Sequence, residues 1–185
     1  MNLEEIIRGR RSIQLYQDKE VDITLLKQLL GTAIWVPNHK MTQPWRFVFV
    51  YGKGKEKIAE LNRRSSAKGT TEEEKKRSGE KAYQKMMGVP VYLMVLLEEN
   101  PDLKTRQEDY AATSCIIQNF SLLAWEKEIG LIWKTGPLTT TEAFRNVIGA
   151  QKGEKVVGML QIGYPAKVPK PRPRVDIHNR IEEIY

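Results

Sequence analysis

Three short apolar segments rich in β-branched or aromatic residues constrain the fold of this chain most strongly. They are residues 45–51 (Trp-Arg-Phe-Val-Phe-Val-Tyr), 90–97 and 156–163, and each has the length and composition of a buried β-strand. Residues 131–133 add a fourth, shorter extended piece. Helical stretches of unequal length separate them, without regular βαβ alternation. The order therefore predicts an α+β fold, in which helices cover a small sheet, and we expect residues 45–51 to be mostly buried.

Helices are predicted from apolar spacing and capping residues. The longest, residues 105–127, becomes apolar on most sides after Tyr110, which is typical of a buried helix. The only cysteine, Cys115, lies within it, so we expect an inert packing residue and no disulfide. The other predicted helices are residues 3–9, with Gly9 as C-cap; residues 22 to about 35, with Asp22 as N-cap; residues 55–62; and residues 139–148, with Thr139 or Thr140 as cap.

Length and hydropathy limit the class of protein. The 185 residues suit a single domain, residues 1–185. The longest apolar run, residues 89–97, is interrupted by Pro90 and is far shorter than the roughly 20 residues that cross a bilayer. The N-terminus lacks the basic-then-apolar order of a secretory signal. We therefore expect a cytoplasmic protein with no membrane partner.

Two segments differ from the rest in composition. Residues 63–85 are densely charged and include the run Glu-Glu-Glu-Lys-Lys-Arg at 72–77. This predicts an exposed helix flanked by mobile loops, which serves either as a solvated face or as a lid over a site. Residues 164–185 form a predicted extended C-terminal arm, with four prolines and a basic stretch at 167–174. Together with the net charge of +7, this stretch suits anionic ligands.

The sequence lacks the common catalytic and nucleotide-binding motifs. It contains no GxGxxG, GxxxxGK[ST], HExxH or GxSxG, and its two histidines, His39 and His178, are far apart. We therefore predict no metal site and no catalytic nucleophile or base. If the chain is an enzyme, a bound cofactor supplies its chemistry.

Three polar clusters remain as candidate binding elements. Arg10-Arg11-Ser12 follows the first predicted helix, and two guanidinium groups with a hydroxyl can hold a phosphate, although a solvated basic corner is the simpler reading. Residues 36–45 form a loop fixed by two prolines, which can present polar groups or merely connect two elements. Residues 133–137 (Trp-Lys-Thr-Gly-Pro) follow the short extended piece, and Gly136 there permits close approach of the backbone to a ligand.

Taken in order, these motifs resemble the short, minimal subgroup of the nitroreductase family of FMN-dependent oxidoreductases. The resemblance is carried by residues 10–12 (Arg-Arg-Ser), 33–37 (Ala-Ile-Trp-Val-Pro) with 43–45 (Gln-Pro-Trp), 130–136, and 158–163 followed by Pro165. It spans residues 5 to about 174. Val36 and Asn38 depart from the usual family pattern, which could alter the shape of a pocket.

The resemblance implies a mainly antiparallel sheet and an intertwined homodimer with FMN at the subunit interface. It implies hydride transfer from NAD(P)H through flavin N5 to a nitro compound, quinone or similar acceptor, with ping-pong kinetics. Arg10, Arg11 and Ser12 would then hold the phosphate and ribityl chain. Trp133, Lys134 and Thr135 would line the isoalloxazine ring. The partner chain would supply Trp35 and His39, with Gln43 nearby, and Arg172 or Arg174 would add a phosphate contact.

Two other functions stay open at this point. The chain could be a flavin-destroying or dehalogenating enzyme of the same fold, since the fold alone does not choose between such reactions. It could also be a basic nucleotide-binding or nucleic-acid-binding module. Only the net charge and the basic stretch support that reading, so we expect no nucleic-acid partner.

Overall fold

A four-stranded antiparallel sheet lies at the centre of the computed structural model, which describes residues 2–185. The order of its strands is β1-β2-β4-β3. The strands are β1 (Trp45–Tyr51), β2 (Val91–Glu98), β3 (Gly130–Lys134) and β4 (Glu154–Gly163). All three neighbouring pairs are antiparallel. The α+β prediction is confirmed, and the extended piece at 131–133 is an edge strand of the same sheet.

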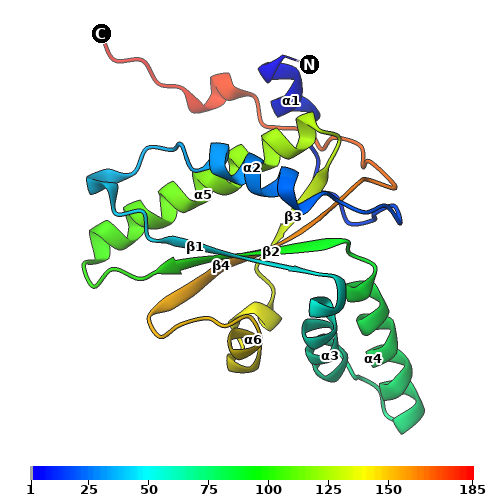
Figure 1. Ribbon diagram of the computed structural model, residues 1–185. Helices are drawn as coiled ribbons and strands as arrows, with labels where there is room; N and C mark the ends of the chain where they lie inside the picture. The colour runs from blue at the N-terminus through cyan, green and yellow to red at the C-terminus, as the bar shows by residue number, and fades with distance from the viewer. Residues whose placement is uncertain (1) are drawn as a thin grey trace.

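Helices cover both faces of this sheet (Figure 1). One face carries α2 (Ile23–Ala33) and the long α5 (Leu103–Glu126). The other face carries α3 (Lys55–Ser65), α4 (Glu72–Met87) and the short α6 (Glu142–Val147). The first helix, α1 (Leu3–Gly9), contacts α5. Within residues 2–185, no helix is long and apolar enough to cross a membrane.

The period of two along β2 explains why the protein has two hydrophobic cores. Successive side chains of a strand point to opposite faces. Val91, Leu93, Val95 and Leu97 pack in the core beneath α2 and α5, whereas Tyr92, Met94 and Leu96 pack in the core with residues of α3, α4 and α6. Every residue of β2 except Glu98 is buried, so this central strand reads as one continuous apolar run in the sequence.

Two burial predictions are wrong. Residues 45–50 are only half-buried and Tyr51 is exposed, because β1 is an edge strand and pairs with another strand on one side only. Cys115 is exposed, because the buried residues of α5 lie on the side that faces the sheet and α2. The apolar composition of α5 predicted burial on most sides, but the opposite side of the helix is uncovered in a single chain.

Helix ends differ from the predictions by a few residues. Asp22 caps α2 as expected, and its carboxylate accepts a hydrogen bond from the Thr24 backbone N–H (2.7 Å). In contrast, Arg10 rather than Gly9 is the C-cap of α1. Thr141, rather than Thr139 or Thr140, caps α6, because residues 137–140 form a separate 3-10 turn. Two further 3-10 turns flank β1, at residues 39–41 and 52–54.

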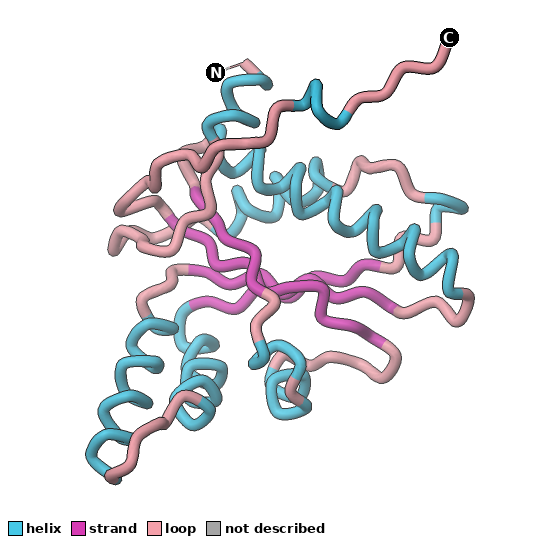
Figure 2. The backbone as a smooth tube through the Cα atoms, turned by 180° about the vertical axis from the view of Figure 1, so that it is seen from behind, coloured by secondary structure: helices cyan, strands magenta, loops and turns pink. Residues whose placement is uncertain are grey.

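The two compositionally distinct segments lie at the edges of the molecule. The charged segment forms most of a helical hairpin, α3–α4, that projects from one end of the sheet (Figure 1). The C-terminal arm runs past α1 and away from the body (Figure 2), with one 3-10 turn at residues 177–180. Every residue from 166 to 185 is exposed, so the arm has no core of its own within one chain.

An ion pair joins β1 to the start of β4 and makes stability depend on pH. Arg46 donates from Nε and Nη2 to the two carboxylate oxygens of Glu154, each at 2.6 Å, and the Gln151 backbone N–H also donates to this carboxylate (2.6 Å). The hydrogen bonds from Arg46 hold the pKa of Glu154 below its ordinary value. A carboxyl group with a lowered folded-state pKa stabilises the fold above its unfolded pKa, and this contribution is lost as the pH falls through the folded value.

We expect Glu154→Gln to lower the free energy of unfolding at pH 7 by about 1–3 kcal/mol, because charge-assisted hydrogen bonds are lost. Part of the interaction is screened, since the Arg46 side chain is 36% exposed. Urea unfolding at pH 7 and again below pH 4 measures the effect. The difference between the variant and the original chain should shrink in acid. A difference that stays constant across this range would show that the carboxylate charge contributes nothing.

Candidate functional site

The Arg10-Arg11-Ser12 cluster and the basic arm meet around one cavity, although more than 150 residues separate them in the sequence. This cavity has a volume of about 310 Å³, and we call it the arginine cavity. An isolated bridge between Ser12 and Leu131 ties the first segment to β3. The lining residues are Arg10, Arg11, Ser12, Gln14, Pro169, Lys170, Pro171, Arg172 and Arg174. Both of the alternative tail arginines are therefore present.

Electrostatics indicate that the arginine cavity is built for an anion. Burial, followed by the nearby guanidinium groups of Arg11 and Arg174, lowers the pKa of Arg10 below its ordinary value. No Asp or Glu is among the lining residues within the described part of the chain. Cations held together without a carboxylate repel one another, and a bound anion relieves that repulsion. Arginine forks also match the geometry of phosphate oxygens.

Arg10 and Arg11 differ in the hydrogen bonds that they make within the protein. Arg11 donates from Nη1 to the carbonyl oxygens of Arg8 (2.6 Å) and Arg10 (2.8 Å), so part of its guanidinium group satisfies the C-terminal end of α1. Within residues 2–185, the Arg10 guanidinium group donates no hydrogen bond to the protein and forms no ion pair. Arg10 is therefore the better placed of the two to bind a ligand.

A second cavity, of about 430 Å³, adjoins the first through Gln14, which lines both. We call it the lysine cavity, because Lys68, Lys85 and Lys134 line it. Its walls come from the end of β3, the 3-10 turn at 137–140, α3 and α4, with Met86 and Met159 as apolar residues. Both cavities are therefore lined by basic residues and by no Asp or Glu of the described chain, and Gln14 is common to the two.

Of the three residues predicted around the isoalloxazine ring, only Lys134 lines the lysine cavity. Gly136 also lines it. Trp133 and Thr135 do not line it. The Trp133 indole packs against the core and donates from Nε1 to the Val157 carbonyl oxygen (3.1 Å). Any contact of Trp133 with a ligand in this cavity would therefore come from its backbone.

The loop between α2 and β1 is held in an unusual conformation. Lys40, Met41 and Gln43 all have positive φ values, of 55°, 50° and 44°, which non-glycine residues adopt at a cost. A hydrogen-bond network offsets this cost. The Asn38 side-chain oxygen accepts from the Gln43 backbone N–H (2.8 Å), and the Asn38 side-chain amide nitrogen donates to the Thr42 hydroxyl oxygen (2.9 Å).

A buried carboxylate completes this network. Asp109, which is 1% exposed on α5, accepts a short hydrogen bond from the Thr42 hydroxyl. The network thus anchors the loop to the longest helix of the protein. The loop is a defined element that presents His39 and Gln43 at the surface, where both are exposed.

Trp35, His39 and Gln43 do not reach either basic cavity within one chain. Gln43 lines a different cavity, beside Arg46 and Glu154. Trp35 is 86% exposed just after α2, and neither Trp35 nor His39 is among the residues that line the arginine and lysine cavities. A single protomer therefore brings together Arg10, Arg11, Ser12, Lys134 and Arg174, but not these three residues.

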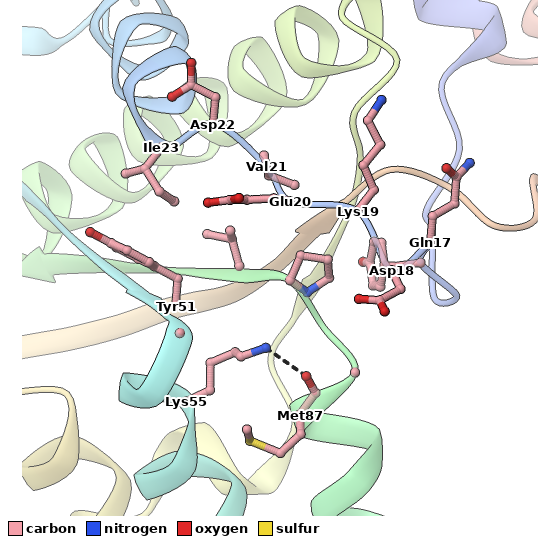
Figure 3. A pocket seen from close by; sticks show the side chains of 15 residues that line it. Gln17, Asp18, Lys19, Glu20, Val21, Asp22, Ile23, Tyr51, Lys55 and Met87 are labelled. Atoms are coloured by element: carbon pink, nitrogen blue, oxygen red, sulfur yellow. Dashed lines mark hydrogen bonds between the residues drawn. The ribbon is translucent and has the colours of Figure 1, made fainter.

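Another cavity, of about 950 Å³, is larger than the arginine and lysine cavities and shares no lining residue with them. It lies between residues 16–23 and the end of β1, and Figure 3 shows Asp18, Glu20, Tyr51 and Lys55 around it. Lys55 donates to the carbonyl oxygens of Met87 (2.8 Å) and Val89 (2.9 Å). Its ammonium group therefore satisfies backbone acceptors at the C-terminal end of α4. The predicted site residues do not line this cavity, so size alone does not identify the site.

Four polar residues of these sites were missed by the sequence analysis. They are Gln14, Lys68, Lys85 and Asp109. Gln14 stands between the buried Ile13 and the exposed Leu15, a position without any recognisable motif. Asp109 gives no usable signal in the sequence either, because it follows the polar residues 104–108. Among residues 2–185, no cluster of three or more potential metal ligands occurs.

The fold and the site define a class: an α+β protein whose paired basic cavities suit an elongated ligand with an anionic end. Comparison with known proteins gives the family. The sequence pattern of the Nitroreductase family matches residues 7–164. A Bacillus subtilis protein named "Putative NAD(P)H nitroreductase YfhC" is 36% identical over 186 residues, covering 98% of this chain and 94% of its own.

Solved structures agree with this result. A nitroreductase-like family protein from Bacillus cereus is 37% identical and superimposes with a TM-score of 0.88, covering 100% of this chain and 96% of its own. The FMN and NADPH-dependent nitroreductase NfnB of "sphigopyxis sp. strain HMH" has a TM-score of 0.80 and 18% identity, with full coverage of both chains; at this identity it is evidence for the fold alone. The chain belongs to the nitroreductase family, as the motif resemblance predicted.

Proposed function

We propose that this nitroreductase-family protein is an FMN-dependent NAD(P)H oxidoreductase that reduces a nitro compound, quinone or similar acceptor. The observation that carries the proposal is that the arginine cavity and the lysine cavity share Gln14 as a lining residue. FMN is an elongated molecule with a phosphate at one end and a flat ring system at the other, which matches this arrangement. The names of similar proteins support the same proposal, since one names NAD(P)H and another names FMN and NADPH.

The residues present fit FMN at the phosphate end. A phosphate monoester carries between about one and a half and two negative charges at pH 7. Arg10, Arg172 and Arg174 would hold these charges, and Ser12 and Gln14 would donate hydrogen bonds to the phosphate or ribityl chain. The arm and residues 10–14 border the same cavity, so both segments could contact a phosphate bound there.

The residues at the other end would position and tune the ring. FMN supplies two-electron hydride chemistry when bound, accepting hydride from NAD(P)H and passing it to the acceptor. For a nitro group, two electrons and two protons leave a nitroso group and water. Lys134 lines this cavity and would contribute a positive charge to a flavin ring bound there, which would favour the reduced, more negative form. No protein nucleophile or base is needed, since water can supply the proton.

The proposal includes a homodimer in which each FMN site is completed by Trp35, His39 and Gln43 of the other subunit. Large apolar side chains support this part. Trp35 is 86% exposed, and Leu103, Ile177 and Ile181 are 68%, 60% and 52% exposed, which is typical of a surface that another chain covers. A cytoplasmic location also belongs to the proposal, since a chain with one cysteine needs no oxidising compartment.

Steady-state kinetics test the shared site. We expect NAD(P)H and the acceptor to bind in turn at the lysine cavity, so that double-reciprocal plots at several acceptor concentrations are parallel. The rates should be measured without oxygen, which competes as an acceptor. Lines that intersect would mean that both substrates bind at once, and would contradict a single site used in turn.

A further inference from the structure

The chemistry of the lysine cavity suggests which acceptors it selects. Three lysines line it, namely Lys68, Lys85 and Lys134, and no Asp or Glu is among the lining residues of residues 2–185. The apolar residues Met86, Leu138 and Met159 also line it. A molecule that satisfies both features has an aromatic or apolar body and an anionic group.

The ammonium groups of these lysines are free of carboxylates in the described part of the chain, unlike neighbouring cations. In the α3–α4 hairpin, Arg63 pairs with Glu60 and Glu80, Arg64 pairs with Glu60, and Lys75 pairs with Glu72. No ion pair is found for Lys68, Lys85 or Lys134 across residues 2–185. No carboxylate of the described chain therefore competes with a ligand for the charges of these three cavity-lining lysines.

The framework of the hairpin fixes where these lysines stand. Ser78 Oγ accepts a hydrogen bond from the Lys68 backbone N–H (2.8 Å) and donates to the Lys68 carbonyl oxygen (2.7 Å). Gly79 allows close packing there, since a Cβ at this position would lie 3.0 Å from the Arg63 carbonyl oxygen. Next to Lys85, the Met86 carbonyl oxygen accepts from the buried Tyr92 hydroxyl (2.8 Å). Both lysines therefore project from anchored backbone.

We propose that the α3–α4 hairpin selects electron acceptors that carry a carboxylate, sulfonate or phosphate group, through Lys68 and Lys85. This inference rests on the proposed function. The arginine cavity matches the FMN phosphate and Lys134 is assigned to the flavin ring, so Lys68 and Lys85 are available to the second ligand. A compact aromatic acceptor can place its ring by the methionines and its anionic group at the lysines.

The hydride donor is the competing source of the same charge, because NADPH and NADH also carry phosphates. In both, a ribose separates the nearest phosphate from the nicotinamide, so these charges extend out of a cavity of about 430 Å³. The experiment must nevertheless separate the two sources.

The test uses the flavin-loaded enzyme with a matched pair of acceptors, 4-nitrobenzoate and its neutral methyl ester. Values of kcat/KM are measured without oxygen for the original chain, Lys68→Met, Lys85→Met and the double variant, with NADH and with NADPH. Side-chain replacement at 68 leaves the Ser78 hydrogen bonds in place, because these involve backbone atoms. Lys81→Met is the control, since Lys81 lies on α4 but does not line the cavity.

We expect each single variant to lower kcat/KM for 4-nitrobenzoate by about two- to fivefold, mainly through KM, and the double variant by about tenfold. The ester, and both acceptors with Lys81→Met, should be unaffected. Lys85→Arg should retain the preference, and added salt should weaken it in the original chain.

Three outcomes would overturn the inference or its basis. Equal losses for the acid and the ester would remove the role of charge. Losses that follow the nicotinamide donor, whichever acceptor is present, would assign the lysines to the donor's phosphates. Absence of NAD(P)H oxidation with both acceptors, or of flavin binding, would instead reject the proposed function itself, so the two failures are distinguishable.

Discussion

Replacing Arg10 with alanine should weaken FMN binding by about 1.5–3 kcal/mol, which is roughly a tenfold to hundredfold rise in Kd. Arg10 is half-buried in the arginine cavity, where burial and two neighbouring guanidinium groups lower its pKa. A phosphate in this cavity would lose its best-placed charged partner. Equilibrium titration of the flavin-free protein with FMN, followed by quenching of flavin fluorescence, measures the change.

Two variants make this prediction specific. Arg11→Ala should have a smaller effect on FMN affinity, because its guanidinium group donates to two backbone carbonyls. Arg8→Ala should have none, since the Arg8 side chain is 79% exposed and pairs with Glu4. Unchanged FMN affinity in Arg10→Ala, with normal unfolding behaviour, would remove Arg10 from the phosphate site.

Replacing Gly158 with alanine should lower the free energy of unfolding by about 1–3 kcal/mol, and the melting temperature by about 2–10 °C. A Cβ at this position would lie well inside van der Waals contact with the Trp133 indole. The indole cannot move without breaking the hydrogen bond from Nε1 to the Val157 carbonyl oxygen. Val157 is the extra residue where the register between β2 and β4 shifts, so the bulge, the glycine and the indole form one unit.

Gly31 provides a matched control in the same protein. It lies within α2, and a Cβ there would meet nothing within 4 Å, so Gly31→Ala should leave stability unchanged or raise it slightly. Thermal unfolding and near-ultraviolet circular dichroism of both variants measure the effects. If Gly158→Ala proves as stable as Gly31→Ala, with an unchanged tryptophan signal, the steric account of Gly158 is wrong.

The fold could be predicted from the sequence only in part. The strands at 45–51, 90–97 and 156–163 were found because local composition alone identifies them. The exposure of β1 could not be predicted in this way, because it depends on β1 lying at the edge of the sheet, whose strand order is β1-β2-β4-β3. Likewise, Cys115 was expected to be buried because composition does not reveal which side of a helix other elements cover.

The residues of the candidate site could likewise be predicted only in part. Arg10, Lys134 and Arg174 were predicted from the motifs of the resemblance, and the chain brings them to adjoining cavities. Lys68 and Lys85 could not be distinguished from the other charges of residues 63–85. Which lysine faces the cavity depends on how α3 and α4 pair, a long-range property that a charge run does not encode.

The central claim is that this chain binds FMN and that NAD(P)H reduces it. The most direct test is a visible absorbance spectrum of the freshly purified protein, repeated after NADH or NADPH is added without oxygen. We expect an absorbance band of oxidised flavin in the blue region of the visible spectrum. This band should bleach when NADH or NADPH is added. A colourless protein that also fails to take up added FMN would contradict the account, and a yellow protein that neither nicotinamide bleaches would contradict its proposed hydride donor.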